Sequence, residues 1–414
     1  MLTNLFQKPK QRQQRVERLK ASPHQMPEAE QKHLPTHPID HALIYIVALL
    51  TLAGVMSIFS ASAHVAQANM DDGIFYFRRQ ILGVFVGSFA LIVASRINLY
   101  KLSRWIRPLM ILTIFLLVCT HLPVIGVTSK GSSRWLNIPF IRFQPSEIAK
   151  PMLVLYLAGI LGNARFILLS LKEKFIAFLP VFAIMAIVLK QPDLGTTIVI
   201  GSTVLMLCFL AGLPYRYVLG VLVTGFFGAA AVVLSNPYQM NRVTSWLDPW
   251  SDPKNTGYHL IQSMIAIGSG GVTGNGVGQS VQKLFYLPEQ HTDFIFAVIS
   301  EELGLIGGVL LFVFFCALTQ RGLAIASRAP TPYLKLLAMG LACMISMQAL
   351  VNLGVVTGTI PTTGLTLPFI SFGSSSLVVN LAAMGLLLNV SRYIPRRNSA
   401  QTGNTRQRSR KAKS

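Results

Sequence analysis

Ten apolar stretches recur along this chain, and each has about the length that a helix needs to cross a lipid bilayer. Hydrophobic residues make up 52% of the sequence and charged residues only 12%, a balance typical of polytopic membrane proteins. We therefore predict an all-α integral membrane protein of about ten transmembrane helices, at residues 42–62, 80–95, 106–122, 147–162, 176–190, 195–212, 216–234, 294–319, 333–357 and 376–394.

The basic residues predict how these helices are oriented. The chain has 36 Lys and Arg residues against 15 Asp and Glu residues, for a net charge of +21. If the N-terminus is inside, most of the basic residues fall in segments that face the cytoplasm, in agreement with the positive-inside rule. Topology and attraction to anionic lipid explain the charge, so we expect no nucleic-acid partner.

This topology divides the chain into three parts. Residues 1–41 are expected to be a disordered cytoplasmic tail, residues 42–394 the ten-helix membrane domain, and residues 395–414 a basic cytoplasmic tail. A large extracytoplasmic loop, residues 235–293, joins the seventh helix to the eighth. Apolar residues at 260, 261, 264 and 265 predict an amphipathic helix in the membrane interface. The glycines that follow indicate hinges and close backbone packing: Gly268, Gly270, Gly271, Gly274, Gly276 and Gly278.

Polar motifs lead into the fourth, sixth, eighth and tenth spans, which all run from the outer face to the inner face. Each of these helices therefore directs its N-terminal N–H groups and its positive dipole end outward. Pro145 and Pro192 suit a first helical turn. The candidate binding residues of the motifs are Gln144, Ser146, Glu147, Lys150, Gln191, Asp193, His291, Thr292, Thr362, Ser371 and Ser374.

Two interpretations of these motifs remain open. Ser146, Asp193, Thr292 and Ser374 are good helix caps, and capping alone would explain any one of them. Four such helix starts on the side that also carries basic residues favour a site for a phosphorylated substrate. The basic residues are Arg134, which is followed by the candidate Trp135, and Lys150, Lys190 and Arg242.

Acidic residues mark the expected reaction centre. Four of the 15 acidic residues of the chain are Glu289, Asp293, Glu301 and Glu302, at the start of the eighth span. Carboxylates are costly in hydrocarbon, so those that occur there usually serve a function. The histidines show no recognisable metal-ligand spacing, and the sequence has no Gly-x-Ser-x-Gly nucleophile motif in a suitable context. A carboxylate is therefore the best chemical candidate, and a metal requirement is left unknown.

Several separated motifs, in order, resemble the SEDS family (shape, elongation, division and sporulation) of peptidoglycan glycosyltransferases. They include Arg134-Trp135, Gln144-Pro145-Ser146-Glu147, Gln191-Pro192-Asp193-Leu194-Gly195-Thr196, His291-Thr292-Asp293-Phe294-Ile295-Phe296 and the region from Pro361 to Ser376. The resemblance covers residues 42–394 and is strongest to the division member. One departure is Phe372-Gly373-Ser374-Ser375-Ser376, where the family commonly has Tyr-Gly-Gly-Ser-Ser.

The resemblance implies a polymerase of lipid II, an undecaprenyl-pyrophosphate disaccharide-peptide, at the outer leaflet of the cytoplasmic (inner) membrane of the septum. It implies that Asp293 is catalytic, as general base of an inverting transfer, with Arg242, Glu289, Glu301 and the motif residues around the substrate. It also implies a class B penicillin-binding protein of the FtsI type as partner and FtsQ, FtsL, FtsB and FtsN as regulators. No cofactor is certain, and a divalent cation is left open. Both termini would be cytoplasmic.

Two other functions fit parts of the sequence. Ten spans and a polar outer vestibule would also suit a lipid II flippase, although transporters more often place their sites near the midplane. A non-catalytic division scaffold would fit the tails but would leave the outer carboxylates unexplained.

Overall fold

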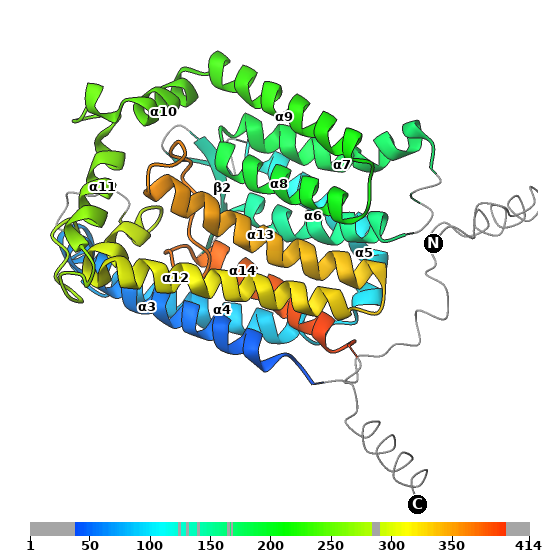
Figure 1. Cartoon of the computed structure of the whole chain (residues 1–414), viewed down its shortest axis with the longest axis horizontal. Coiled ribbons are helices and arrows are strands. Elements are labelled where there is room, and N and C mark those ends of the chain that lie inside the picture. The colour runs from blue at the N-terminus through cyan, green and yellow to red at the C-terminus, as the bar shows by residue number, and fades with distance from the viewer. Residues whose placement is uncertain are drawn as a thin grey trace, which may run out of the picture.

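The computed structural model describes residues 38–122, 126–129, 132–138, 141–163, 166, 169–283 and 290–394. Both predicted tails lie outside these residues except for residues 38–41, and so does Glu289. Every predicted span corresponds to a helix, and these helices run side by side (Figure 1). They are α3 (His41–Met70), α4 (Phe75–Ala94), α5 (Leu99–Cys119), α6 (Pro145–Leu161), α7 (Leu171–Lys190), α8 (Leu194–Leu210), α9 (Tyr215–Ser235), α12 (Ile295–Arg328), α13 (Pro332–Val356) and α14 (Ser374–Ser391).

Seven helices of the described part are long and apolar enough to cross a membrane. The other three that match predicted spans are α6 and α8, with 17 residues each, and α7, which has charged residues at both ends. A helix of 17 residues is at the lower limit of what spans the hydrocarbon core. All three pack against the longer helices α5 or α13. The chain is therefore a multi-pass, helical membrane protein.

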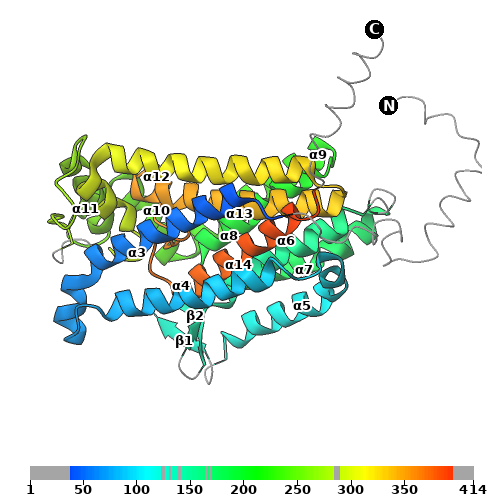
Figure 2. The same cartoon turned by 90° about the horizontal axis from the view of Figure 1, so that it is seen from below.

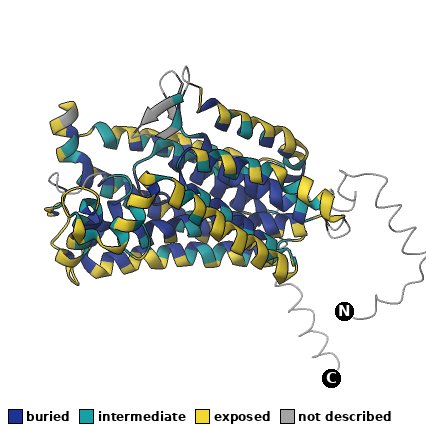
Figure 3. Cartoon of the chain, turned by 90° about the horizontal axis from the view of Figure 1, so that it is seen from above, coloured by how far each residue is buried: buried dark blue, intermediate teal, exposed yellow. Residues whose placement is uncertain are grey.

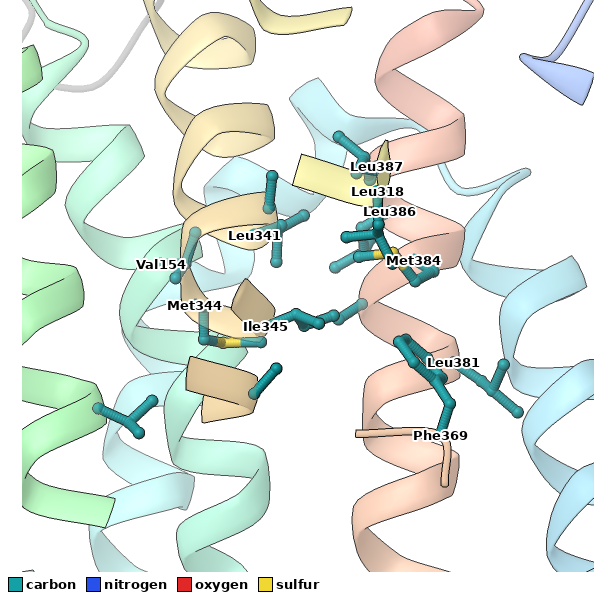
Figure 4. Packing of buried hydrophobic residues seen from close by; sticks show 14 of the residues in the cluster. Val154, Leu318, Leu341, Met344, Ile345, Phe369, Leu381, Met384, Leu386 and Leu387 are labelled. Atoms are coloured by element: carbon teal, nitrogen blue, oxygen red, sulfur yellow. The ribbon is translucent and has the colours of Figure 1, made fainter. Parts of the chain in front are cut away.

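Helices α13 and α14 form the centre of the bundle. Most of their residues are buried, and they pack against each other and against α6 and α12. Figure 4 shows Ile345 of α13 on the side of Met384 and Leu386 of α14, and Met344 of α13 on the side of Val154 of α6. Burial is greatest along this centre (Figure 3), whereas no residue of α9 is buried. α9 therefore lies at the periphery.

Helix α4 lies along α14 through small residues. A side-chain Cβ on Gly87 would come within 2.5 Å of Leu381 Cδ1, and one on Gly385 within 2.3 Å of the carbonyl oxygen of Leu91. Small residues allow such close approach of helix backbones in membranes. Glycine at these two positions thus sets the α4–α14 distance.

One end of the bundle carries the non-spanning elements. Helices α10 (Pro237–Leu247) and α11 (Tyr258–Gly270) and the short helix η2 (Pro249–Ser251) lie there, opposite the end at which α3 begins and α14 ends (Figures 1 and 2). A small antiparallel sheet in the order β1-β2-β3 precedes α6, with β1 at Gly126–Ser129, β2 at Ser132–Ile138 and β3 at Ile141–Phe143. This sheet was not predicted from the sequence, because its strands are too short to show a clear alternation.

Helix α11 confirms the predicted loop helix but not its place. Leu260 and Ile261 are buried, and α11 packs on α12. Part of the apolar face therefore contacts protein while Ile265 is exposed, and the place of this helix in the membrane interface stays a prediction.

The eighth span is interrupted, which the sequence analysis did not predict. Gly304 has a φ of 67° and a ψ of −165° inside α12. The carbonyls of Gly271 and Val272 accept hydrogen bonds from the N–H groups of Leu305 (2.9 Å) and Ile306 (3.2 Å). The N–H groups of Asn275 and Gly276 bond to the carbonyls of Glu301 and Glu302, each at 3.0 Å. Non-helical backbone is tolerated at membrane depth when protein groups satisfy it in this way.

Candidate functional site

The starts of α8 and α12 meet at the connection between α13 and α14, residues 357–373. At the start of α8, a Cβ on Gly195 would lie 2.9 Å from Thr363 Cβ. At the turn before α12, the Asp293 Oδ2 atom lies 3.5 Å from where a Cβ on Gly364 would be. Gly364 has a φ of 74°, a conformation that favours glycine, so the backbone can pass close to this carboxylate.

Asp193 is the one predicted cap that the structure confirms. It is the N-cap of α8, and its carboxylate accepts hydrogen bonds from the N–H (3.0 Å) and the hydroxyl (2.9 Å) of Thr196. Pro192 precedes this cap and is not in the first helical turn. Asp193 is buried and its carboxylate makes the cap hydrogen bonds, so it stabilises the turn between α7 and α8.

Arg134 holds the same turn. Its guanidinium donates to the carbonyls of Gln191 (3.1 Å) and Pro192 (2.6 Å) and lies 3.8 Å from the Asp193 carboxylate. The buried Gln191 amide donates in turn to Thr120 Oγ1 at 2.7 Å. Arg134 therefore holds two carbonyls of this turn and lies beside the Asp193 carboxylate, while neighbouring Trp135 is half-buried in β2.

The other predicted caps were wrong. The N-caps of α6, α12 and α14 are Gln144, Phe294 and Gly373, and none of them makes a side-chain cap bond. Ser146 lies inside α6 and accepts a hydrogen bond from the Gln144 amide at 3.1 Å. Thr292 precedes the cap of α12, and Ser374 is already the first residue of α14. A serine or threonine near a helix start can lie one or two residues before or after the N-cap position. The backbone conformation of the turn decides which residue is the N-cap.

Lys150 and Glu147 form a buried pair at the start of α6. Their charged atoms are 2.9 Å apart, and Lys150 also donates to Gln348 Oε1 at 2.6 Å. Gln348 Nε2 then donates to the carbonyl of Thr366, at 2.9 Å, in the α13–α14 connection. Lys150 thus faces inward with Glu147 and does not reach outward to solvent.

The turn that carries Asp293 is bordered by aromatic rings. The ring of His291 lies 4.5 Å from that of Tyr76 and 5.8 Å from that of Phe372, between centroids. The His291 carbonyl accepts a hydrogen bond from the Phe372 N–H at 2.8 Å, so this turn is joined to the α13–α14 connection. His291, Thr292 and Asp293 are half-buried, which leaves this turn accessible.

Glu301 and Glu302 hold the outer loop. Both oxygens of Glu301 accept hydrogen bonds from residues 280–282, namely the Ser280 hydroxyl and the N–H groups of Val281 (2.9 Å) and Gln282 (3.4 Å). The carboxylate of Glu302 pairs with Lys283 at 3.1 Å. Both glutamates are buried. The structure thus gives Glu301 an anchoring role, and its contact with substrate stays a prediction.

Helix α10 reaches across to the α13–α14 connection. Arg242 donates to the Thr362 carbonyl (3.0 Å) and to the Tyr238 hydroxyl (2.6 Å), and Trp246 Nε1 donates to the carbonyl of Gly358 (2.8 Å). Within the connection, Ser371 Oγ accepts a hydrogen bond from the Leu367 N–H at 2.8 Å. Thr362 and Ser371 therefore belong to the folded connection, and Arg242 lies beside it.

These contacts do not settle whether the reaction needs a metal ion. Among the described residues, no group of three or more His, Cys, Asp or Glu side chains could hold a metal ion. Three residues that contribute to the contacts above were not predicted from the sequence: Tyr76, Gln348 and Lys283. For Gln348 a signal did exist, because an amide is unusual inside an apolar span.

Comparisons with known proteins show which family and which relatives this chain resembles. Residues 40–395 match the family of cell cycle proteins that comprises FtsW, RodA and SpoVE. The "Stage V sporulation protein E" of Bacillus subtilis is 42% identical over 355 residues, which cover 86% of this chain and 97% of that protein. A "Probable peptidoglycan glycosyltransferase FtsW" of Geobacter sp. is 39% identical over 353 residues, which cover 85% and 96%.

Solved structures show the same fold. A chain of a peptidoglycan synthase complex that coordinates polymerization and crosslinking has a TM-score of 0.69 and 30% identity, over 86% of this chain and 98% of that one. The rod shape determining protein RodA of Thermus thermophilus has a TM-score of 0.62 and 29% identity, over 86% and 97%.

Proposed function

Because this chain belongs to the FtsW/RodA/SpoVE family of cell cycle proteins, the SEDS family, we propose that it is the peptidoglycan glycosyltransferase that polymerises lipid II at the division septum, with Asp293 as its general base. The observation that carries the proposal is the position of Asp293. Its half-buried carboxylate lies in the turn before α12, against Gly364 of the α13–α14 connection.

The reaction suits one carboxylate. An acceptor sugar hydroxyl must lose its proton as its oxygen attacks the anomeric carbon of the donor, and the bond from that carbon to the lipid pyrophosphate breaks. The pyrophosphate leaves as an anion, so cations and helix dipoles replace a general acid. Asp293 takes the proton, and direct displacement inverts the anomeric centre. Half-buried Arg242, beside Thr362, is the basic residue we expect nearest the pyrophosphate.

A divalent cation, if the reaction needs one, would bind through the pyrophosphate oxygens of the substrate, since these are hard ligands. Within the parts of the chain that the structure describes, no cluster of side chains competes for it. We therefore expect any metal dependence to vary with the substrate and not to accompany folding.

Partners follow from the same family. We expect a class B penicillin-binding protein of the FtsI type to supply crosslinking, as a neighbouring fold comes from a complex that both polymerises and crosslinks. FtsQ, FtsL, FtsB and FtsN would regulate the pair. The termini would be cytoplasmic, since α3 begins and α14 ends at the end of the bundle away from the candidate site.

Polymerisation of purified lipid II in detergent by this chain and its partner tests the proposal. Asp293→Asn keeps the shape of the side chain but cannot accept the proton, so the rate should fall by about 10²–10⁴-fold. Substantial activity of this variant would make Asp293 a structural residue. Detergent removes the second compartment, so a lipid II flippase or a scaffold would give no polymer even with the parental chain.

A further inference from the structure

The buried amide of Asn352, on α13, joins two segments of the candidate site. Its Nδ2 atom donates one hydrogen bond to the carbonyl of Asp293, at 2.8 Å, and another to the carbonyl of Leu365, at 2.7 Å. The side chain is 1% exposed, and among the described residues its Oδ1 atom has no hydrogen-bond partner. Both N–H bonds of the amide are therefore used to hold two backbone positions together.

We propose that Asn352 is a positioning residue, which holds Asp293 at the distance and angle that proton transfer requires. This rests on the proposed role of Asp293 as general base. Asn352 bonds to the backbone carbonyl of Asp293, so it would act through Asp293 and not on the substrate.

The segments that Asn352 joins have little regular structure of their own. Asp293 lies in a turn, and residues 361–367 form neither helix nor strand. Backbone carbonyls without such partners must be satisfied by side chains or water. A primary amide suits this place because one nitrogen carries two N–H bonds and no charge.

A second hydrogen bond limits the loss of rate that we expect when Asn352 is replaced. The N–H of Phe372 donates to the carbonyl of His291, two residues before Asp293, and joins the same turn to a later part of the α13–α14 connection. Loss of Asn352 should therefore loosen the position of Asp293 without separating the segments. A displacement of about 1 Å can lower a rate by on the order of 10²-fold, so we expect a loss of about 10–10²-fold in kcat.

Asn389 on α14 offers a matched control. It is fully buried, its Nδ2 atom donates to the carbonyls of Ala94 (2.8 Å) and Ile97 (2.5 Å), and its Oδ1 atom has no partner among the described residues. These contacts join α14 to the turn between α4 and α5, at the end of the bundle away from Asp293. The two asparagines thus make the same bonds, but only one of them holds the candidate base.

The experiment compares Asn352→Ala and Asn389→Ala in the complex with the penicillin-binding partner, using purified lipid II. Both variants should lower the unfolding temperature in detergent to a similar extent. Only Asn352→Ala should lower kcat, with little change in KM, and move the acid limb of the pH–rate profile. Asn352→Ser, which keeps one donor, should recover part of the rate.

Two results would overturn the proposal: equal kcat for the two alanine variants per folded complex, or a loss for Asn352→Ala with an unchanged pH profile and no recovery in Asn352→Ser. If Asn352→Ala fails to fold, Asn352→Ser carries the same comparison against Asn389→Ser.

Asp293→Asn, measured alongside, separates this inference from the proposed function. If Asp293→Asn is active, Asp293 is not the general base, and the role proposed for Asn352 fails as well. An inactive Asp293→Asn with a fully active Asn352→Ala removes only the inference. In the Asp293→Asn background, adding Asn352→Ala should not lower the residual rate further, because residues that act through one group are not additive.

Discussion

The ammonium group of Lys283 lies 3.1 Å from the carboxylate of Glu302, and both side chains are buried. Ser60 of α3 completes the cluster, since its hydroxyl donates to Glu302 at 2.5 Å. Glu302 is two residues before Gly304, where α12 is interrupted. The pair therefore fixes the outer loop to α3 and α12 beside the break, about two and a half turns beyond Asp293 along α12.

Lys283→Met should destabilise the protein strongly, because it leaves the Glu302 carboxylate buried without its cation. Loss of one partner of a buried pair typically costs about 3–5 kcal/mol. Unfolding in detergent, followed by temperature or denaturant, measures the effect. In the double variant Lys283→Met, Glu302→Leu most of the stability should return. Equal stability of the single and double variants would show that the pair does not hold the loop.

The helices of the membrane domain could be predicted from the sequence because hydrocarbon imposes a simple rule. A long apolar stretch has few alternatives to a helix in a bilayer, whatever its neighbours are. Each of the ten predicted spans accordingly corresponds to a helix, including the short α6 and α8. The break in α12 could not be predicted in this way. Gly304 departs from the helix because residues 271–276 bond to the separated backbone, and these are distant in sequence.

The candidate site was predicted in outline but not in detail. Asp293, Lys150 with Glu147, and Arg134 with Asp193 were found because charged residues are rare in this chain. The role of Glu301 depends on residues 280–282, which only the folded loop brings to it. Asn352 is uncharged, and its importance arises from two carbonyls whose positions the sequence does not give.

Arg134→Ala should reduce polymerisation by roughly 10²-fold, because the turn between α7 and α8 loses the donor that holds two of its carbonyls. Arg134→Lys should be intermediate, since a single ammonium cannot reproduce the planar fork of donors. The measurement is the rate with purified lipid II per folded complex.

Arg321 provides the control for this prediction. It pairs with Asp40 at 2.9 Å near the start of α3 and is more exposed than Arg134. Arg321→Ala should leave the rate within about twofold of the parent, since exposed pairs contribute little. If Arg134→Ala behaves in the same way, the turn that it holds does not matter to the reaction.

Lys150→Met should unfold more easily than the parent, by about 3–5 kcal/mol, because it leaves the buried Glu147 carboxyl group without its cation. In Glu147→Gln, Lys150→Met the stability should largely return. The rate should stay lowered in the double variant, since Gln348 loses the ammonium that orients it toward Thr366. A double variant with the parental rate would limit the pair to a structural role.

Cysteines at Asn255 and Asn275 should react with an impermeant thiol reagent added from outside, and cysteines in both tails only from inside. Both asparagines are exposed at the end of the bundle that carries α10 and α11. The background must lack Cys119, Cys208, Cys316 and Cys343. Labelling of residue 255 or 275 from the cytoplasmic side alone would contradict the orientation that the charge distribution predicts.

Gly304→Ala should prevent the loop from packing into the break of α12. The φ of 67° at this position disfavours a residue with a Cβ, and the new Cβ would lie 2.4 Å from the Gly274 N and 2.5 Å from the Val272 carbonyl oxygen. Neither backbone atom can give way without losing the bonds that close the break. We expect lower stability, faster proteolysis of residues 271–283 and loss of polymerisation.

Gly228→Ala in α9 is the control for Gly304→Ala, because a Cβ there would meet nothing within 4 Å. Alanine exceeds glycine in helix propensity, so this variant should match the parent or gain about 0.5–1 kcal/mol. Proteolysis rates and lipid II polymerisation, measured on both variants in detergent, decide between two cases. If Gly304→Ala matches Gly228→Ala, the break is not needed, and α12 can form one continuous helix without harm to the site. If only Gly304→Ala opens the loop, the interrupted helix is what keeps Glu301, Glu302 and their loop partners in place beside the turn that carries Asp293.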